Sequence, residues 1–285
     1  MRFKLTLENA RQQWIPINYQ YPLSAWIYKT FATADGEFAD WLHEHGYAFN
    51  GNRKFKLFTF SNLRLKGAKF QARPAPVLSV PPGRHEWLLS FYMEEAANHF
   101  IRGLFNGQDL VVADKNNRAE FRVSSVECLP DPELKTTERL QCVAPMVLSR
   151  GRLTNGKLRA EYLSPEDEDY GHLLKENLIR KYVAAHQEKV ATVESDGNIE
   201  NQYIDLPFDS DLWDFKLMNK PKSKLLTIKA GTPQQSKVRG FLFEFEWTAP
   251  PELMAFGYQA GFGEKGSLGM GMVGRLQLKQ EPILY

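Results

Sequence analysis

Residues 261–273 read Gly-Phe-Gly-Glu-Lys-Gly-Ser-Leu-Gly-Met-Gly-Met-Val, and this stretch decides how the chain is interpreted. Five glycines lie between Gly261 and Gly271, with Lys265 and Ser267 among them. Glycine accepts a positive φ and lets the backbone approach a ligand closely. Successive N–H groups in such a turn form a concave site for anions. The stretch therefore predicts a phosphate-binding loop, and the plainer alternative is a tight glycine-rich hairpin.

The spacing of the glycines argues against two common nucleotide-binding loops. The pattern G-x-G-x-x-G occurs at Gly261, Gly263 and Gly266, but it must open a helix in a βαβ unit with an acidic residue about 20 positions on. Nineteen residues follow Gly266, which is too few for that unit. The order Lys-Gly-Ser also differs from the Gly-Lys-[Ser/Thr] of a P-loop. Because residues 272–279 alternate like a strand, the loop better suits a protein that follows a polynucleotide backbone.

Outward from the loop, the apolar pattern predicts alternating strands and helices. In the first half, strands are expected at 2–8, 55–60, 84–92 and 121–128, and helices at 22–33, 37–45 and 94–105. In the second half we expect a hairpin of 146–150 with 157–162, a helix from 165 to about 189, strands at 224–229 and 238–247, and a helix at 250–258. Residues 196–214 have no period and are expected to be a surface insertion.

The pattern predicts an α+β protein with two domains. Pro130–Thr137 is polar, contains prolines and lacks a period, so it is the expected boundary between domains at 1–130 and 138–285. The element order in each half permits a ferredoxin-like arrangement, which would make two such domains in tandem.

Composition describes an ordinary soluble globular protein. The chain has 285 residues, 43% hydrophobic and 25% charged, with a formal net charge of +2. No apolar run reaches the 18 or more residues of a membrane span, and the N-terminus lacks the apolar region of a signal peptide. The two cysteines, Cys128 and Cys142, have no partners at zinc-site spacing and are expected to be reduced thiols. We expect a cytoplasmic protein without membrane attachment.

The glycine-rich stretch resembles the C-terminal motif of the CRISPR repeat-processing endoribonucleases, which belong to the repeat-associated mysterious protein superfamily. Four blocks of the first half resemble the same family in order and separation: Met1-Arg-Phe-Lys-Leu-Thr-Leu7, Ile27-Tyr-Lys29, Trp41-Leu-His-Glu44 and Lys56-Leu-Phe-Thr-Phe-Ser61. The resemblance implies two tandem ferredoxin-like (RRM-like) domains. It also implies metal-independent cleavage of CRISPR precursor RNA within its repeats, by 2′-OH attack, leaving 2′,3′-cyclic phosphate and 5′-OH ends and producing guide RNAs.

The resemblance assigns catalysis to Tyr28, His43 and Lys56 in the first domain. Histidine suits proton transfer near neutral pH because its ordinary pKa is about 6.5. Lysine suits stabilisation of the charge on the phosphorane, and a tyrosine hydroxyl can orient or donate. No cluster of carboxylates at metal-ligand spacing accompanies them. We therefore expect neither a metal nor a cofactor.

Each of these residues also has a plainer interpretation. Tyr28 lies in an apolar helical pattern, where tyrosines usually belong to the core. A histidine on a short helix is usually a surface residue, and His45 competes with His43 for the catalytic role. Lys56 follows other basic residues at 53–54, so its role could be shared. The stretch 47–52 is longer than in some relatives, which weakens the assignment of the lysine.

We expect the glycine-rich loop of the second domain to bind RNA. The residues assigned to this role are Gly261, Gly263, Lys265, Gly266, Ser267, Gly269 and Gly271. Further basic side chains could carry RNA or simply form a solvated surface: Arg150, Arg152, Lys216, Lys220, Lys222, Lys224, Lys237 and Arg239.

The expected partner is CRISPR repeat RNA, with a CRISPR effector complex as a further candidate. Two alternative functions remain. A non-catalytic RNA-binding subunit of such a complex would be favoured if the three candidate catalytic residues lay far apart. A nucleotide-dependent enzyme would bind a mononucleotide at the glycine-rich loop.

Overall fold

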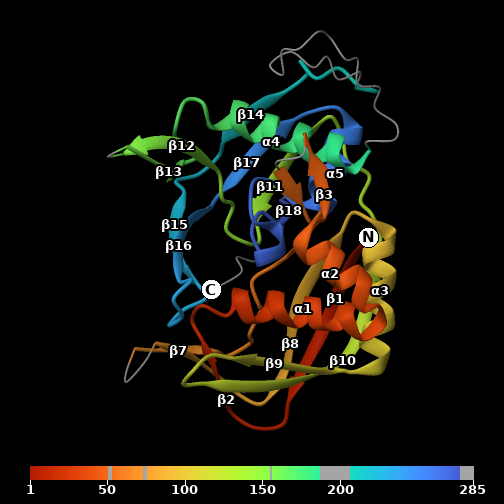
Figure 1. Cartoon of the computed structure of the whole chain (residues 1–285), viewed down its shortest axis with the longest axis vertical. Coiled ribbons are helices and arrows are strands. Elements are labelled where there is room, and N and C mark those ends of the chain that lie inside the picture. Colours follow the sequence, from red (N-terminus) through yellow and green to blue (C-terminus); the bar gives the residue numbers. More distant parts are fainter. Residues whose placement is uncertain (51–52, 73–75, 155, 187–205, 277–285) are drawn as a thin grey trace.

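Two antiparallel sheets with helices packed on them make up the protein. The computed structural model describes residues 1–50, 53–72, 76–154, 156–186 and 206–276, and Figure 1 shows their arrangement.

The first sheet has the strand order β5-β8-β1-β10-β9, and all neighbouring strands are antiparallel. Its strands are β1 (Arg2–Asn9), β5 (Phe58–Phe60), β8 (Gly83–Phe91), β9 (Asp109–Ala113) and β10 (Arg118–Leu129). Alternation along β1 buries Leu5 and Leu7 completely. Because side chains of a strand point to opposite faces in turn, these leucines define the face that the helices cover.

The helices of the first half are α1 (Gln20–Ala34), α2 (Gly36–Glu44) and α3 (Glu94–Asn106). Leu23, Ile27 and Phe31 recur every four residues along α1 and are fully buried against the sheet. Helices α1 and α3 approach closely because Gly103 has no side chain: a Cβ there would lie 1.9 Å from the carbonyl oxygen of Thr30.

The second sheet has the order β14-β17-β11-β18. Its elements are β11 (Thr137–Cys142), α4 (Tyr170–Ala185), β14 (Asp214–Leu217), β17 (Glu244–Thr248), α5 (Pro251–Ala260) and β18 (Val273–Arg275). In both halves the first strand lies between the third and the fourth, with the second strand beyond the third. This is the ferredoxin-like βαββαβ arrangement. The predicted α+β fold with two tandem ferredoxin-like units is confirmed.

Several smaller sheets are added to this framework. They are the hairpin β12 (Ser149–Thr154) with β13 (Lys157–Tyr162), the hairpin β15 (Lys222–Ile228) with β16 (Ser236–Leu242), the hairpin β3 (Tyr47–Phe49) with β4 (Arg53–Phe55), and a three-stranded sheet of β2 (Gln13–Pro16), β7 (Val77–Val80) and β6 (Lys69–Gln71). The β15–β16 hairpin descends beside the start of α1 (Figure 1), where the Thr227 amide donates to the Asn18 side chain at 3.0 Å.

Two predicted strands are each divided in the structure. The strand expected at 55–60 breaks at Leu57, which has a φ of +52°, so that β4 and β5 belong to different sheets. The strand expected at 238–247 breaks at Phe243 into β16 and β17. The helix expected from 165 begins at Tyr170, and residues 187–189 lie outside the described residues. Parts of two further predictions also lie outside the described residues: 196–205 of the expected insertion and 277–279 of the last expected strand.

Direct contacts join the two halves. The guanidinium of Arg2 is almost fully buried, donates to the carbonyls of Val273 (2.8 Å) and Tyr258 (2.5 Å), and stacks 3.7 Å above the Tyr258 ring. The Thr59 hydroxyl donates to the Met270 carbonyl at 2.7 Å. Strand β10 ends at Leu129 and β11 begins at Thr137. Our division at 1–130 and 138–285 is compatible with these ends and stays a proposal.

Candidate active site

Tyr28 lies on α1, where its ring packs edge-on against its neighbours. The ring centroids are 5.1 Å from His43 and 5.8 Å from Phe58. Burial raises the pKa of Tyr28 to about 12, and a side-chain hydrogen bond with Ser267 opposes that rise. The phenol therefore stays protonated near neutral pH and can act as a hydrogen-bond donor.

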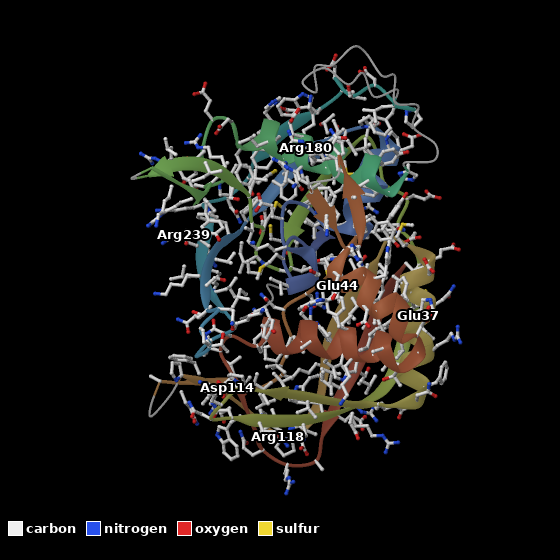
Figure 2. The ribbon with its side chains drawn as sticks, in the orientation of Figure 1. Glu37, Glu44, Asp114, Arg118, Arg180 and Arg239 are labelled. Atoms are coloured by element: carbon white, nitrogen blue, oxygen red, sulfur yellow. The ribbon has the colours of Figure 1, made fainter. Side chains whose placement is uncertain are left out.

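His43 lies in the last turn of α2 and remains exposed to solvent. Asp35 caps the start of this helix by accepting the Phe38 amide at 2.9 Å, which fixes the helix and hence the position of His43. Glu37 and Glu44 mark the two ends of α2 in Figure 2. The ring of His43 can meet a substrate on one side while its other edge rests on Tyr28.

His45 takes a different direction. It is the residue after the last turn of α2, its side chain is 62% exposed, and its Nε2 lies 4.0 Å from the Glu44 carboxylate. The structure therefore brings His43, rather than His45, against Tyr28.

The ammonium of Lys56 sits at the C-terminal end of α2. It donates to the backbone carbonyls of Leu42 and of His43, the latter at 2.7 Å. Burial lowers the pKa of Lys56 to about 8, with a smaller contribution from the cation of Lys54. The negative end of the helix dipole favours a cation at this position. Lys56 thus holds the helix turn that carries His43.

Room for Lys56 depends on Gly46, which has a φ of +62°. A Cβ on Gly46 would lie 3.0 Å from the Cδ of Lys56 and 2.5 Å from the carbonyl oxygen of Phe55. Only glycine therefore combines this backbone conformation with the passage of the lysine side chain. Tyr28, His43 and Lys56 are brought together by α1, the end of α2 and the turn after β4.

The glycine-rich loop packs against the protein itself. Its centre is a short 3₁₀ helix at Gly266–Leu268. Backbone carbonyls of the protein accept the N–H groups of six loop residues at 2.7–3.0 Å: Gly261, Phe262, Glu264, Leu268, Gly269 and Gly271. These six N–H groups are used within the fold. The expected use of the loop's N–H groups for phosphate is therefore restricted to its other residues.

All five glycines of the loop lie where a side chain would collide. A Cβ would come within 1.8–3.0 Å of protein atoms at each of Gly261, Gly263, Gly266, Gly269 and Gly271. Three of these collisions are with β5: the side chain of Thr59 for Gly261, the carbonyl oxygen of Phe58 for Gly266 and the ring of Phe60 for Gly269. The glycines thus let the loop settle on the first sheet, and that contact carries Ser267 to Tyr28.

Two charged side chains hold the first part of the loop, and no pattern in the sequence indicates either role. Lys181 on α4 is buried and donates to the Gly261 carbonyl at 2.8 Å, and burial lowers its pKa to about 7. The carboxylate of Glu264 accepts the amide and the hydroxyl of Ser149 at 2.9–3.0 Å. Lys265, which follows Glu264, is exposed.

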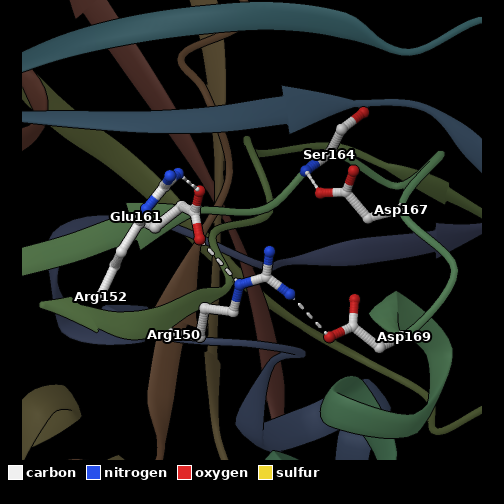
Figure 3. A network of polar contacts seen from close by, with 6 residues as sticks. All are labelled: Arg150, Arg152, Glu161, Ser164, Asp167 and Asp169. Atoms are coloured by element: carbon white, nitrogen blue, oxygen red, sulfur yellow. Dashed lines mark hydrogen bonds and ion pairs between the residues drawn. The ribbon is translucent and has the colours of Figure 1, made fainter.

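The other basic candidates fall into two groups. Arg150 and Arg152 form ion pairs with Glu161 at 2.8 and 2.7 Å, and Arg150 also reaches Asp169 at 3.0 Å (Figure 3). Their charges are largely balanced within the protein. The remaining candidates for RNA binding are exposed: the lysines at 216, 220, 222, 224 and 237, and Arg239 (Figure 2).

Comparison with known proteins identifies the family. Residues 14–127 match the family "CRISPR-associated protein Cas6, N-terminal", and residues 129–274 match the family "CRISPR associated protein Cas6, C-terminal". The chain belongs to the Cas6 family. The predicted resemblance to the CRISPR repeat-processing family is thereby confirmed.

Individual Cas6 proteins match over nearly the whole chain. A Methanocaldococcus jannaschii protein named CRISPR-associated endoribonuclease Cas6 1 is 27% identical over 99% of this chain and 95% of its own. A Pyrococcus furiosus protein named as endoribonuclease-like is 25% identical over 91% of each chain. The structure of a Cas6-related protein from Pyrococcus furiosus superposes with a TM-score of 0.77 at 23% identity, covering 98% and 99% of the two chains.

Two further observations concern the described part of this Cas6 chain. No helix within it is long and apolar enough to cross a membrane. Within the same ranges, no group of three or more His, Cys, Asp or Glu side chains is close enough together to hold a metal ion.

Proposed function

We propose that the chain is an endoribonuclease that cuts CRISPR precursor RNA within its repeats to produce guide RNAs. The observation that carries the proposal is the convergence of Tyr28, His43 and Lys56 at one point of the first domain. Its relative in Methanocaldococcus jannaschii bears the name of a CRISPR-associated endoribonuclease. The convergence also weakens the alternative of a non-catalytic RNA-binding subunit, which a wide separation of these residues would have favoured.

The proposed reaction needs no metal. The 2′-OH of one nucleotide attacks the adjacent phosphorus, forming an O2′–P bond while the P–O5′ bond breaks. The proton of the 2′-OH leaves, and the 5′ oxygen gains one. The products carry a 2′,3′-cyclic phosphate and a 5′-OH.

Each candidate residue has a role that its surroundings support. His43 is exposed, and histidine is the side chain best suited to proton transfer near neutral pH. Tyr28, whose pKa burial raises to about 12, is protonated near neutral pH and donates to a phosphate oxygen. Lys56 offers its remaining N–H to the equatorial oxygens, where charge develops.

We propose that repeat RNA also contacts the glycine-rich loop through Lys265 and Ser267, the exposed and half-buried polar residues at its centre. The glycines at 261, 263, 266, 269 and 271 contribute by giving the loop its shape. Lys216, Lys220, Lys222, Lys224, Lys237 and Arg239 extend the basic surface available to RNA. Delivery of the product to a CRISPR effector complex belongs to the same proposal.

One experiment tests the reaction. Repeat RNA is incubated with the protein in EDTA, and the product ends are mapped. We expect cleavage to persist, to leave the cyclic phosphate, and to stop when the nucleotide 5′ of the cut is 2′-deoxy. Activity lost in EDTA and restored by Mg²⁺ would refute the mechanism. Tight binding without cleavage of any repeat RNA would favour the non-catalytic alternative.

A further inference from the structure

Leu57 has an unusual backbone conformation beside the candidate site. Its φ is +52°, in the left-handed region that leucine rarely adopts. Such strain persists where surrounding contacts hold the residue in place, and it is frequent at functional sites. Leu57 follows Lys56 directly, so its conformation sets the direction in which that lysine leaves the backbone.

The surroundings that hold Leu57 belong largely to the other half of the molecule. Its side chain is 4% exposed and lies in the hydrophobic cluster of the second half, with Leu140, Leu178 and Phe256 among its members. Its carbonyl accepts the Tyr92 amide at 3.0 Å. The Tyr92 ring in turn packs 4.5 Å from that of Phe256.

Three consecutive residues therefore enter three different environments. Lys56 reaches the C-terminal end of α2, Leu57 enters the core of the second half, and Phe58 enters the core of the first half. A regular strand turns successive side chains to opposite faces only. The left-handed residue makes this three-way division possible.

We propose that Leu57 is a positioning residue: its side chain, seated in the second half's core, fixes the place where the Lys56 ammonium meets the end of α2. This inference rests on the proposed ribonuclease function, since it gives the lysine's position a catalytic purpose. It also means that the second half takes part in shaping a site whose candidate catalytic residues all come from the first.

Kinetics of Leu57→Ala measure the consequence. A shift of about 1 Å in a group that contacts the reacting atoms can lower a rate on the order of 100-fold. We expect kcat for repeat cleavage to fall about 10- to 100-fold with little change in KM, and Leu57→Met to restore most of the rate. The control is Leu174→Ala, which truncates a fully buried leucine of the same core on α4 and should leave kcat unchanged.

Titration of Lys56 supplies a readout that is independent of RNA cleavage. The ζ position of isotope-labelled lysines is followed by NMR in the free protein, with exposed Lys54 as an internal reference. Leu57→Ala should release Lys56 toward an ordinary lysine titration, and Leu174→Ala should not. Leu57→Gly keeps the left-handed backbone conformation accessible. It should still release Lys56, because in our proposal the packing of the Leu57 side chain holds the lysine in place.

The outcomes are distinct. If the wild-type protein does not cut RNA, the proposed function fails while the titration still tests the position of Lys56. If the wild-type protein cuts but Leu57→Ala behaves like Leu174→Ala in both measurements, the positioning role is wrong. An unchanged Lys56 titration in Leu57→Gly would likewise overturn it.

Discussion

His43 and His45 differ by two positions in the sequence but have different surroundings in the fold. The ring of His43 meets Tyr28, whereas His45 points toward Glu44 and solvent. General acid–base groups contribute on the order of 10²–10⁴-fold to a rate. We expect His43→Ala to lower the cleavage rate by that order with little loss of RNA affinity, and His45→Ala to be nearly silent. Exchanged results in single-turnover assays would move the catalytic role to His45.

We expect Lys56 to make the cleavage rate fall at high pH. Its pKa is lowered to about 8 by burial, so its charged fraction falls as the pH rises through that value. If the ammonium stabilises the phosphorane, the rate should fall over the same range. Lys56→Ala should be slower and should lose this limb of the pH–rate profile. A wild-type rate that stays level to pH 10 would exclude charge stabilisation by Lys56.

The same group affects stability with the opposite trend. An unfolded lysine has its pKa near 10.5, above the folded value. Between about pH 8 and 10.5 the unfolded chain therefore binds more protons at this position. Folding stability then gains from Lys56 as the pH rises through this range. Activity and this stability contribution thus respond to alkali in opposite directions.

At the scale of elements, Lys265 in the glycine-rich loop is the residue most open to RNA. A phosphate contact to single-stranded RNA adds about 0.7 to the slope of log affinity against log salt. We expect Lys265→Ala to reduce the slope by about that amount and to leave the melting temperature unchanged. Affinities measured at several salt concentrations test this. An unchanged slope would assign the loop to the fold alone.

A substitution at Gly266 tests whether the shape of the loop is needed both for folding and for RNA binding. A side chain there would meet the Phe58 carbonyl, 2.6 Å from the Cβ position. Gly266→Val should therefore lower both the melting temperature and the RNA affinity. Gly107→Val is the control: neither Gly266 nor Gly107 has a positive φ, but nothing lies within 4 Å of the Cβ position of Gly107. Equal losses of melting temperature in the two variants would mean that the collision with Phe58 is not responsible.

The sequence predicts most elements but not the places where they break. The periodic spacing of apolar residues, together with turn residues, predicted the ends of α1, α2, α3 and α5 to within about two residues of their observed positions. The break at Leu57 was missed because leucine is not a turn residue, and contacts distant in sequence, with Tyr92 and the core of the second half, hold it there. For the same reason Ser267 was assigned to RNA without its contact to Tyr28.

At the scale of the whole molecule, Arg2 links the first strand to the second half. Arg2→Met would keep the apolar stem but leave the carbonyls of Val273 and Tyr258 without this donor. An unsatisfied buried polar group costs about 1–3 kcal/mol. We expect a lower melting temperature and a separation of calorimetric unfolding into two transitions. Arg118→Met, at an exposed ion pair, should show neither change.

The apolar pattern predicted an α+β protein with two domains and permitted the tandem ferredoxin-like arrangement, which the family resemblance implied. The pattern missed β11 and β14, which are two of the four strands of the second sheet. The way in which the halves meet was not predicted. Arg2 and Thr59 join the halves by donating to backbone carbonyls of distant segments. Local patterns carry no information about such pairings.

Those distant pairings have a consequence for the speed of folding. The Thr59–Met270 and Arg2–Val273 hydrogen bonds join residues 211 and 271 positions apart. Contacts between residues so far apart in the sequence form slowly, because the entropy cost of closing a long loop must be met before the contacts can stabilise the protein. On refolding from denaturant, secondary structure should return before cleavage activity does. The delay should persist when a prolyl isomerase is added. We expect each half to reach its own topology early and the candidate site to be complete only after the two halves have docked.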